Sequence, residues 1–313
     1  MPSAVAWLFP GQGSQSVGMA RELVQRSIAA ARVFEEASDA LRLDMRALCW
    51  ESPQDTLDRT ANTQPALLTA SIAALRAAEE LSGGLDEPIV AMGHSLGEFT
   101  ALVAAGALGL ADAVRLVRTR GELMQAADPS GGMLAVLGLD GDAVAKAIED
   151  TGMVVANDNA PGQVVISGPR DAFEHATASL KDAGAKRVLP LRTSAAFHSP
   201  AMRPVAPALA KAIAATPFST LRYRVVANVD AQIHEHAAEF PPLLEKQMWS
   251  PVQWVACMRR AEGEGAAAFV EFGPGNVLTG LAKRILPEAR TANVSDARTL
   301  EEALPVLRQD PHR

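Results

Sequence analysis

The sequence predicts an α/β fold: a large domain with a mainly parallel sheet, into which a smaller α+β subdomain is inserted. Two observations predict this fold class. Short apolar stretches rich in β-branched residues alternate with Ala/Leu-rich amphipathic stretches, which is typical of a parallel sheet covered by helices. Within residues 129–196 the predicted order changes to βαββαβ, the order of a ferredoxin-like unit. A chain of 313 residues is long enough for both parts.

Three segments of the large domain are predicted as strands because they are short and apolar: Val5–Phe9, Pro88–Met92 and Phe269–Phe272. Glycine or proline follows each of them, which favours a turn at the strand end. The second strand passes through a glycine-rich turn directly into a predicted helix that reaches Ala105. We expect the large domain to comprise residues 1–128 and 197–313.

The small subdomain is expected within residues 129–196. Its predicted strands are Met133–Leu137, Val154–Asn157, Gln163–Ser167 and Arg187–Leu191, and its predicted helices are Gly141–Asp150 and Arg170–Ala183. The second and third strands are expected to be joined by a turn rich in Asn, Pro and Gly. A cleft between the two parts of the molecule is the natural place for a ligand.

The composition is that of a folded globular protein. Hydrophobic residues make up 48% and charged residues 21% of the chain, which excludes a disordered protein. The net charge of −7 argues against non-specific binding of nucleic acid. The two cysteines, Cys49 and Cys257, form no metal-binding pair and favour a reducing, cytoplasmic location. We expect no membrane span and, from the start at Met1–Pro10, no secretory signal.

The segment Gly93–Gly97 has the pattern G-x-S-x-G between a predicted strand and a predicted helix. In this context the pattern is typical of a nucleophile elbow, a sharp turn that exposes a strained serine, although a chance glycine-rich turn is the alternative. Ser95 is therefore the candidate nucleophile, and the main-chain N–H of Leu96 is a candidate oxyanion donor. A second donor is the main-chain N–H of Gln12, although its loop alone favours an ordinary turn.

A serine needs a nearby base to act as a nucleophile. Five of the six histidines stand in less suitable places, on the elbow itself, on an amphipathic helix, in a polar segment or at the C-terminal end: His94, His175, His234, His236 and His312. His198 remains, in a loop that follows the predicted subdomain. No carboxylate is marked by its context as a third member of a triad, so a main-chain carbonyl could orient the imidazole instead.

One arginine falls on the apolar side of a predicted helix. Residues Asp112–Gln125 have helical periodicity, and Arg120 lies in the same arc as Leu116 and Met124. A buried guanidinium needs an anion, which is either a protein carboxylate or a substrate carboxylate; a structural ion pair or a snorkelling side chain is the alternative. Beside a serine nucleophile, the planar guanidinium of Arg120 would bind a carboxylate with two hydrogen bonds and so select acyl groups that carry a free acid.

Through these and further motifs the sequence resembles the malonyl-CoA:acyl carrier protein transacylases of fatty acid synthesis and the wider acyltransferase family of polyketide synthases. The resemblance covers nearly the whole chain. Its motifs are, in order, Phe9–Gln15, Thr63–Leu67, Gly93–Gly97, Arg120–Met124, Pro161–Gly168, His198, Asn228–Asp230, Gln247, Pro251–Trp254 and Phe272–Gly275. So many motifs in one order are far more specific than any one of them alone.

The resemblance implies an α/β-hydrolase-like core with a small ferredoxin-like part packed against it. It also implies a role for each residue singled out above. Ser95 would be the acylated nucleophile and His198 its base. The amides of Gln12 and Leu96 would form the oxyanion hole, and Arg120 would bind the malonyl carboxylate.

Three further residues take their expected roles from the resemblance. The main-chain carbonyl of Gln247 would orient the histidine in place of an acid, while Met124 and Phe197 would contribute to the substrate pocket. Phe197 marks a departure from the bacterial fatty acid enzymes, which often have a small residue before the histidine. The triplet Ala196-Phe197-His198 resembles malonyl-selective polyketide acyltransferases, in which the ring excludes an α-methyl branch with moderate selectivity.

The expected reaction is a ping-pong transfer of a malonyl group from malonyl-CoA, through a malonyl-serine, to the phosphopantetheine thiol of an acyl carrier protein, with no metal or redox cofactor. Fatty acid synthesis, a trans-acting polyketide synthase and a malonate decarboxylase system all fit such an enzyme. A serine esterase or thioesterase is the rival enzyme. A catalytically silent scaffold that binds carrier proteins is the rival without enzymatic activity.

Acyl carrier proteins are acidic, so an enzyme with a net charge of −7 must bind them through a local basic patch. The candidates are Lys186-Arg187, Arg203 and Lys283-Arg284, each of which also fits an ordinary solvated surface. We expect a cytoplasmic monomer whose partners are malonyl-CoA and acyl carrier protein, with no nucleic acid and no membrane.

Overall fold

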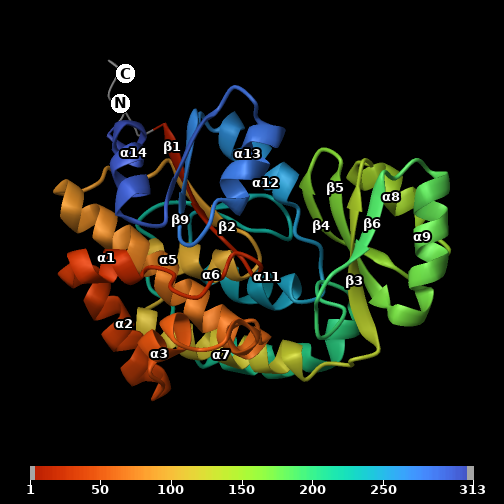
Figure 1. Cartoon of the computed structure of the whole chain (residues 1–313), viewed down its shortest axis with the longest axis horizontal. Helices are drawn as coiled ribbons and strands as arrows, with labels where there is room; N and C mark the ends of the chain where they lie inside the picture. Colours follow the sequence, from red (N-terminus) through yellow and green to blue (C-terminus); the bar gives the residue numbers. More distant parts are fainter. Residues whose placement is uncertain (1–3, 309–313) are drawn as a thin grey trace.

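The computed structural model describes residues 4–308 and is organised around a six-stranded sheet in the order β10-β9-β1-β2-β7-β8 (Figure 1). Every pairing in this sheet is parallel except that of β8 with β7. Its strands are β1 (Val5–Phe9), β2 (Val90–Gly93), β7 (Val225–Val226), β8 (Ile233–His234), β9 (Ala268–Phe272) and β10 (Arg290–Val294). The outermost ends of the predicted large domain, residues 1–3 and 309–313 with His312, lie outside the described residues.

Both faces of this sheet are buried, which explains why its central strands are continuous apolar runs. In β1, Val5, Trp7 and Phe9 belong to one apolar cluster, whereas Ala6 and Leu8 belong to a second cluster. The second cluster is closed by α12 (Trp254–Gly263) and α13 (Val277–Ile285). The first is closed by α1 (Arg21–Arg26), α2 (Ile28–Leu41), α3 (Met45–Trp50), α4 (Gln54–Leu57), α5 (Thr60–Ser82), α6 (Leu96–Ala104), α7 (Leu110–Gln125), α10 (Ala206–Ala214), α11 (Phe240–Gln247) and α14 (Ala297–Leu307).

A separate four-stranded antiparallel sheet lies beside the large one, in the order β4-β5-β3-β6 (Figure 1). Its elements are β3 (Gly131–Leu137), α8 (Gly141–Ala147), β4 (Val154–Ala160), β5 (Gln163–Pro169), α9 (Phe173–Asp182) and β6 (Arg187–Pro190), with a short 3-10 turn at Arg170–Ala172. The chain order is therefore βαββαβ. The predicted fold class is confirmed, while the boundaries 129–196 stay a prediction. Two further 3-10 turns cover Pro200–Val205 and Ala237–Glu239.

Strand β4 is longer than the sequence predicts. The segment that we expected to begin the turn continues to pair with β5, with irregular register around Asn157 and Asp158, and the connection shrinks to Pro161 and Gly162. Gly162 has a φ of 69°, which glycine adopts without strain. Because the bulged strand stays extended up to Ala160, it carries polar side chains to the edge of the large sheet.

Within residues 4–308 no helix is both long enough and apolar enough to cross a membrane. Over the same residues, no cluster of three or more His, Cys, Asp and Glu side chains is placed to hold a metal ion.

Candidate active site

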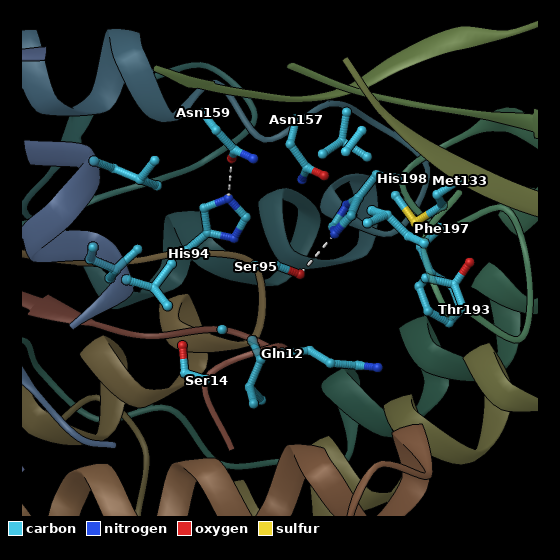
Figure 2. Close-up of a pocket in the computed structure, with 18 of the residues that line it drawn as sticks. Gln12, Ser14, His94, Ser95, Met133, Asn157, Asn159, Thr193, Phe197 and His198 are labelled. Atoms are coloured by element: carbon cyan, nitrogen blue, oxygen red, sulfur yellow. Dashed lines mark hydrogen bonds between the residues drawn. The ribbon is translucent and has the colours of Figure 1, made fainter. Parts of the chain in front are cut away.

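A cavity of about 300 Å³ lies between the large sheet and the small one. The loop after β1 contributes Gln12, the turn after β2 contributes Ser95, and the loop before the 3-10 turn at Pro200–Val205 contributes His198. The small sheet contributes residues of β3, β4 and β5, and α7 contributes Arg120 and Met124. Figure 2 shows the Ser95 and His198 side chains turned toward each other in this cavity. The candidate residues from distant parts of the sequence therefore share one site.

Ser95 has a strained backbone, with φ 53° and ψ −104°, at the turn between β2 and α6. The turn is tight enough to exclude side chains at both flanking positions. A Cβ on Gly93 would lie 2.0 Å from the main chain of Gly97, and a Cβ on Gly97 would lie 2.0 Å from the carbonyl oxygen of Phe9. These contacts explain the glycines of the G-x-S-x-G pattern and hold the Ser95 hydroxyl over the N-terminus of α6.

Replacing Gly97 by alanine is expected to lower the free energy of unfolding by about 3 kcal/mol, because the new methyl group overlaps main-chain atoms that belong to the central strand β1. Chemical denaturation monitored by circular dichroism measures this loss. Gly280→Ala is the matched control: Gly280 lies within α13 with open space around it, so this change should be neutral or slightly stabilising. Equal midpoints for the two variants would contradict the packing argument.

His198 bridges the serine and a main-chain carbonyl. Its Nε2 lies 2.8 Å from Ser95 Oγ, and its Nδ1 lies 2.9 Å from the carbonyl oxygen of Gln247. A carbonyl oxygen only accepts, so Nδ1 carries the proton and Nε2 is left to accept one from the serine hydroxyl. Burial, followed by the positive charge of Arg120, lowers the pKa of His198 to about 3. The imidazole is thus held neutral, in the tautomer that a general base requires.

Arg120 is buried, with 1% of its surface exposed, and reaches the serine. Its Nη2 donates to Ser95 Oγ at 3.1 Å and to Gln247 Oε1 at 2.9 Å, while Nη1 donates to Gln64 Oε1 at 2.9 Å. Within residues 4–308 no carboxylate forms an ion pair with it, and its Nε has no hydrogen-bond partner. Burial lowers the pKa of Arg120 to about 10, so the guanidinium remains charged at neutral pH. Neutral amides therefore hold a cation beside the nucleophile.

Two main-chain N–H groups beside the serine are unpaired. In the described part of the chain, neither the N–H of Gln12 nor that of Leu96 has a hydrogen-bond acceptor. The Gln12 side chain donates to Thr60 Oγ1 at 3.3 Å, and residues Gln12 and Leu96 both line the cavity. Unpaired amides at a helix N-terminus and in a neighbouring loop are available to a developing oxyanion.

The acyl transferase domain family matches residues 6–310. The chain belongs to the acyl transferase family. A malonyl CoA-acyl carrier protein transacylase of Salmonella typhimurium is 45% identical over 305 residues, which are 96% of this chain and 98% of that protein. The resemblance seen in the sequence motifs is therefore confirmed over almost the full length.

Solved structures of relatives agree with this membership of the acyl transferase family. An acyl carrier protein S-malonyltransferase from Vibrio cholerae superimposes with a TM-score of 0.93 at 42% identity, covering 96% of this chain and all of that one. A malonyl-transacylase in complex with a type II PKS acyl-carrier protein superimposes with a TM-score of 0.92 at 38% identity, covering 98% of this chain and 99% of the other.

In this acyl transferase, Asn228 holds the elbow although sequence reasoning gave it no individual role. Its Oδ1 accepts from the main-chain N–H of Ser95 at 2.7 Å, and its Nδ2 donates to the carbonyl of Gly93 at 2.9 Å. The Gln247 side chain, Nε2, also donates to the carbonyl of Ser95 at 3.0 Å. The two amide side chains satisfy the polar main-chain groups of the strained turn.

Two asparagines of β4 are further residues of this acyl transferase site that the sequence did not reveal. Asn159 Oδ1 lies 2.8 Å from His94 Nε2, which turns the His94 ring away from Ser95 (Figure 2). Asn157 lines the cavity beside His198 (Figure 2). Asn159 reaches the site because β4 stays extended where we had expected a turn, whereas Asn157 is the last residue of the strand that we predicted.

Proposed function

We propose that this protein transfers a malonyl group from malonyl-CoA to the phosphopantetheine thiol of an acyl carrier protein, through a malonyl ester of Ser95. The observation that carries this proposal is Arg120, a buried cation held by neutral amides 3.1 Å from the serine oxygen. A desolvated guanidinium without a protein carboxylate is a binding site for a carboxylate on the substrate. The names of the relatives, which include malonyl transacylases, support the same substrate.

In the first half of the reaction, His198 Nε2 takes the proton of Ser95, whose oxygen attacks the thioester carbonyl of malonyl-CoA. The bond between serine oxygen and carbonyl carbon forms, and the oxyanion is stabilised by the amides of Gln12 and Leu96. Collapse of this intermediate breaks the carbon–sulfur bond. The sulfur leaves as coenzyme A with the proton held by His198, whose tautomer the Gln247 carbonyl maintains.

During this step Arg120 binds the free carboxylate of the malonyl group. A guanidinium suits bidentate contact with a carboxylate. In this contact Nη1 uses the hydrogen that it does not donate to Gln64, and at Nη2 the carboxylate takes the place of Ser95 Oγ. Met124 and Phe197, buried at 2% and 5% exposure, contribute to the walls of the cavity around the acyl group. We propose that the Phe197 ring disfavours an α-methyl branch, with the moderate selectivity that one methyl group allows.

In the second half, the carrier-protein thiol gives its proton to His198 and its sulfur attacks the ester carbonyl. The new carbon–sulfur bond forms, the carbon–oxygen bond to Ser95 breaks, and His198 returns the proton to the Ser95 oxygen. Water must be kept away between the two halves, since it would release free malonate. The location of the cavity between two sheets supports this protection. No step needs a metal or a redox cofactor. We further propose a cytoplasmic location, supported by two buried cysteines without a disulfide.

Two of the proposed docking residues lie around the turn between β4 and β5, which leads into Gln163, a residue that lines the cavity. Arg284 on α13 donates to the Gln163 side chain and to the carbonyl of Pro161, which ties α13 to the turn between β4 and β5. Lys186 packs against Gly138, whose main-chain N–H donates to the carbonyl of Gly162 in the same turn. We propose that Lys186 and Arg284 belong to a basic patch that receives an acidic carrier protein. Exposed residues Arg187, Arg203 and Lys283 are the other candidates.

Incubation with malonyl-CoA followed by intact mass spectrometry and addition of a carrier protein tests the function. A malonyl adduct that moves to the carrier thiol supports transfer. Rapid release of free malonate favours a thioesterase, and the absence of any reaction favours a non-catalytic scaffold. The choice among carrier proteins of fatty acid, polyketide and malonate decarboxylase systems is tested by supplying each carrier in turn.

The acylation rate should be insensitive to pH around the ordinary pKa of histidine. His198 is active when neutral, and its pKa is lowered to about 3, so the base form persists as the pH falls through the usual histidine range. At saturating malonyl-CoA, the rate of adduct formation measured by quenched-flow mass spectrometry should stay level from about pH 8 to about pH 5. A loss of rate centred near pH 6.5 would contradict this assignment.

A further inference from the structure

A buried carboxyl group that the proposed mechanism does not use lies one turn beyond the nucleophile. Glu98 is in α6, in which every residue is buried, and none of its own surface is exposed. Its Oε2 accepts from the main-chain N–H of Asn228 at 3.0 Å and from Gln247 Nε2 at 2.8 Å. Over residues 4–308, its Oε1 has no hydrogen-bond partner. Burying a carboxyl group with one unpaired oxygen is costly, which makes a functional role for Glu98 worth testing.

One side-chain amide separates Glu98 from Arg120. Gln247 donates to Glu98 through Nε2 and accepts from Arg120 through Oε1, the latter at 2.9 Å. The carboxyl group and the guanidinium thus face each other across Gln247 without direct contact. Because both side chains are buried, their charges interact across Gln247 more strongly than they would in water. Burial lowers the pKa of Arg120, and the charge of Glu98 acts in the opposite direction.

We propose that Glu98 is the resident counter-charge of Arg120 and that it sets how tightly the enzyme holds a malonyl carboxylate. The inference rests on the proposed function. In the empty site, Glu98 is the anion that offsets the guanidinium. Once a malonyl carboxylate binds Arg120, two anions share one cation and repel each other. Glu98 therefore weakens the binding of charged acyl groups only, which favours release of the malonyl group to the carrier protein.

The charge on Glu98 itself depends on pH. Burial raises its pKa to about 7, against the lowering effect of Asn228, Gln247 and Arg120. Asp230, in the segment between β7 and β8, adds a further raising effect, and Cys257 on α12 is the buried thiol that senses the Glu98 charge in turn. Glu98 is therefore charged above neutral pH and neutral below it, whereas Arg120 stays charged and His198 stays neutral in this range. Acid should tighten malonyl binding.

The test compares the affinity of malonyl-CoA with that of acetyl-CoA, by calorimetry, in a Ser95→Ala background that prevents acylation. Glu98→Gln removes the charge and keeps the hydrogen bonds, because the N–H of Asn228 can only donate and so holds the new amide oxygen in the Oε2 position. At about pH 8.5, malonyl-CoA should bind about fivefold more tightly to the Gln variant. Acetyl-CoA, which shares the coenzyme A moiety, should bind equally to both proteins.

A second arm leaves Glu98 in place. When the Ser95→Ala protein is taken from about pH 8.5 to about pH 6, malonyl-CoA should bind more tightly by a similar factor, and acetyl-CoA should not. This arm decides the question even if Glu98→Gln does not fold. Parallel changes for both ligands, or none for malonyl-CoA, would overturn the role of Glu98. If the wild-type protein forms no malonyl adduct, the proposed function is wrong. If the adduct forms but neither Glu98→Gln nor acid changes the affinity for malonyl-CoA, only the proposed role of Glu98 is wrong.

Discussion

Replacing Ser95 by alanine is expected to abolish the acyl-enzyme and to reduce malonyl transfer at least about 1,000-fold. The variant removes the oxygen that lies 2.8 Å from His198 Nε2 and that carries the malonyl group between the two halves of the proposed reaction. It leaves the cavity and the Arg120 guanidinium in place, so malonyl-CoA should still bind. Intact mass after incubation with malonyl-CoA, together with the steady-state rate of transfer to a carrier protein, measures the effect.

Ser219→Ala is the matched control, because Ser219 is exposed on a surface loop and its hydroxyl makes no hydrogen bond within the described residues. That variant should acquire the malonyl mass as the wild-type protein does. A stoichiometric adduct on Ser95→Ala protein would show that another side chain is acylated, and would remove the elbow from the mechanism.

Replacing Arg120 by alanine should cost about 3 kcal/mol in kcat/KM for malonyl-CoA, roughly a hundredfold, because the carboxylate of the substrate loses its buried cationic partner. Acetyl-CoA has no such carboxylate, so its kcat/KM should be maintained or rise. The specificity should therefore shift toward uncharged acyl groups. Competition between the two thioesters in one reaction, read as the ratio of acyl adducts on Ser95, measures this shift directly.

The control for Arg120 lies on the same helix. Arg115 is exposed and pairs with Asp112, so Arg115→Ala should retain the malonyl preference. Arg120→Lys keeps the charge but loses the planar fork, and an intermediate preference is expected for it. If Arg120→Ala folds, as judged by its melting temperature, and still prefers malonyl-CoA as strongly as the wild-type protein, the carboxylate is bound elsewhere.

Local sequence patterns were enough to locate the site residues that are unusual for their position, such as a glycine pair around a serine or a charged residue among apolar ones. Gly93 and Gly97 frame a strand-to-helix turn, and the contacts of 2.0 Å that a Cβ would make at each show why glycine is required. Arg120 was found because the helical period places a charge among apolar residues. Ser95 and His198 followed from the chemistry of a serine nucleophile, and the structure brings them within 2.8 Å.

The residues that sequence reasoning missed depend on contacts between distant segments. Asn228 holds the serine turn from 133 positions away in the chain, and nothing in its own neighbourhood indicates that contact. Asn159 reaches the cavity because β4 stays extended where the Asn, Pro and Gly residues favour a turn, and Asn157 lies at the end of the predicted strand without any local sign of its place in the site. Glu98 could have been found by the argument used for Arg120, since it is an acid in a helix whose other residues are apolar or small.

The amides that hold Arg120 bear on how acyl specificity can change. Gln64 and Gln247 each direct a side-chain oxygen at the guanidinium, and both side chains are buried. Converting the arginine alone into an apolar residue strands two oxygens without a donor, at a cost of roughly 1–3 kcal/mol each. A change of specificity toward uncharged acyl chains is therefore expected to involve all three positions. Replacing Arg120 alone lowers the stability of the folded protein.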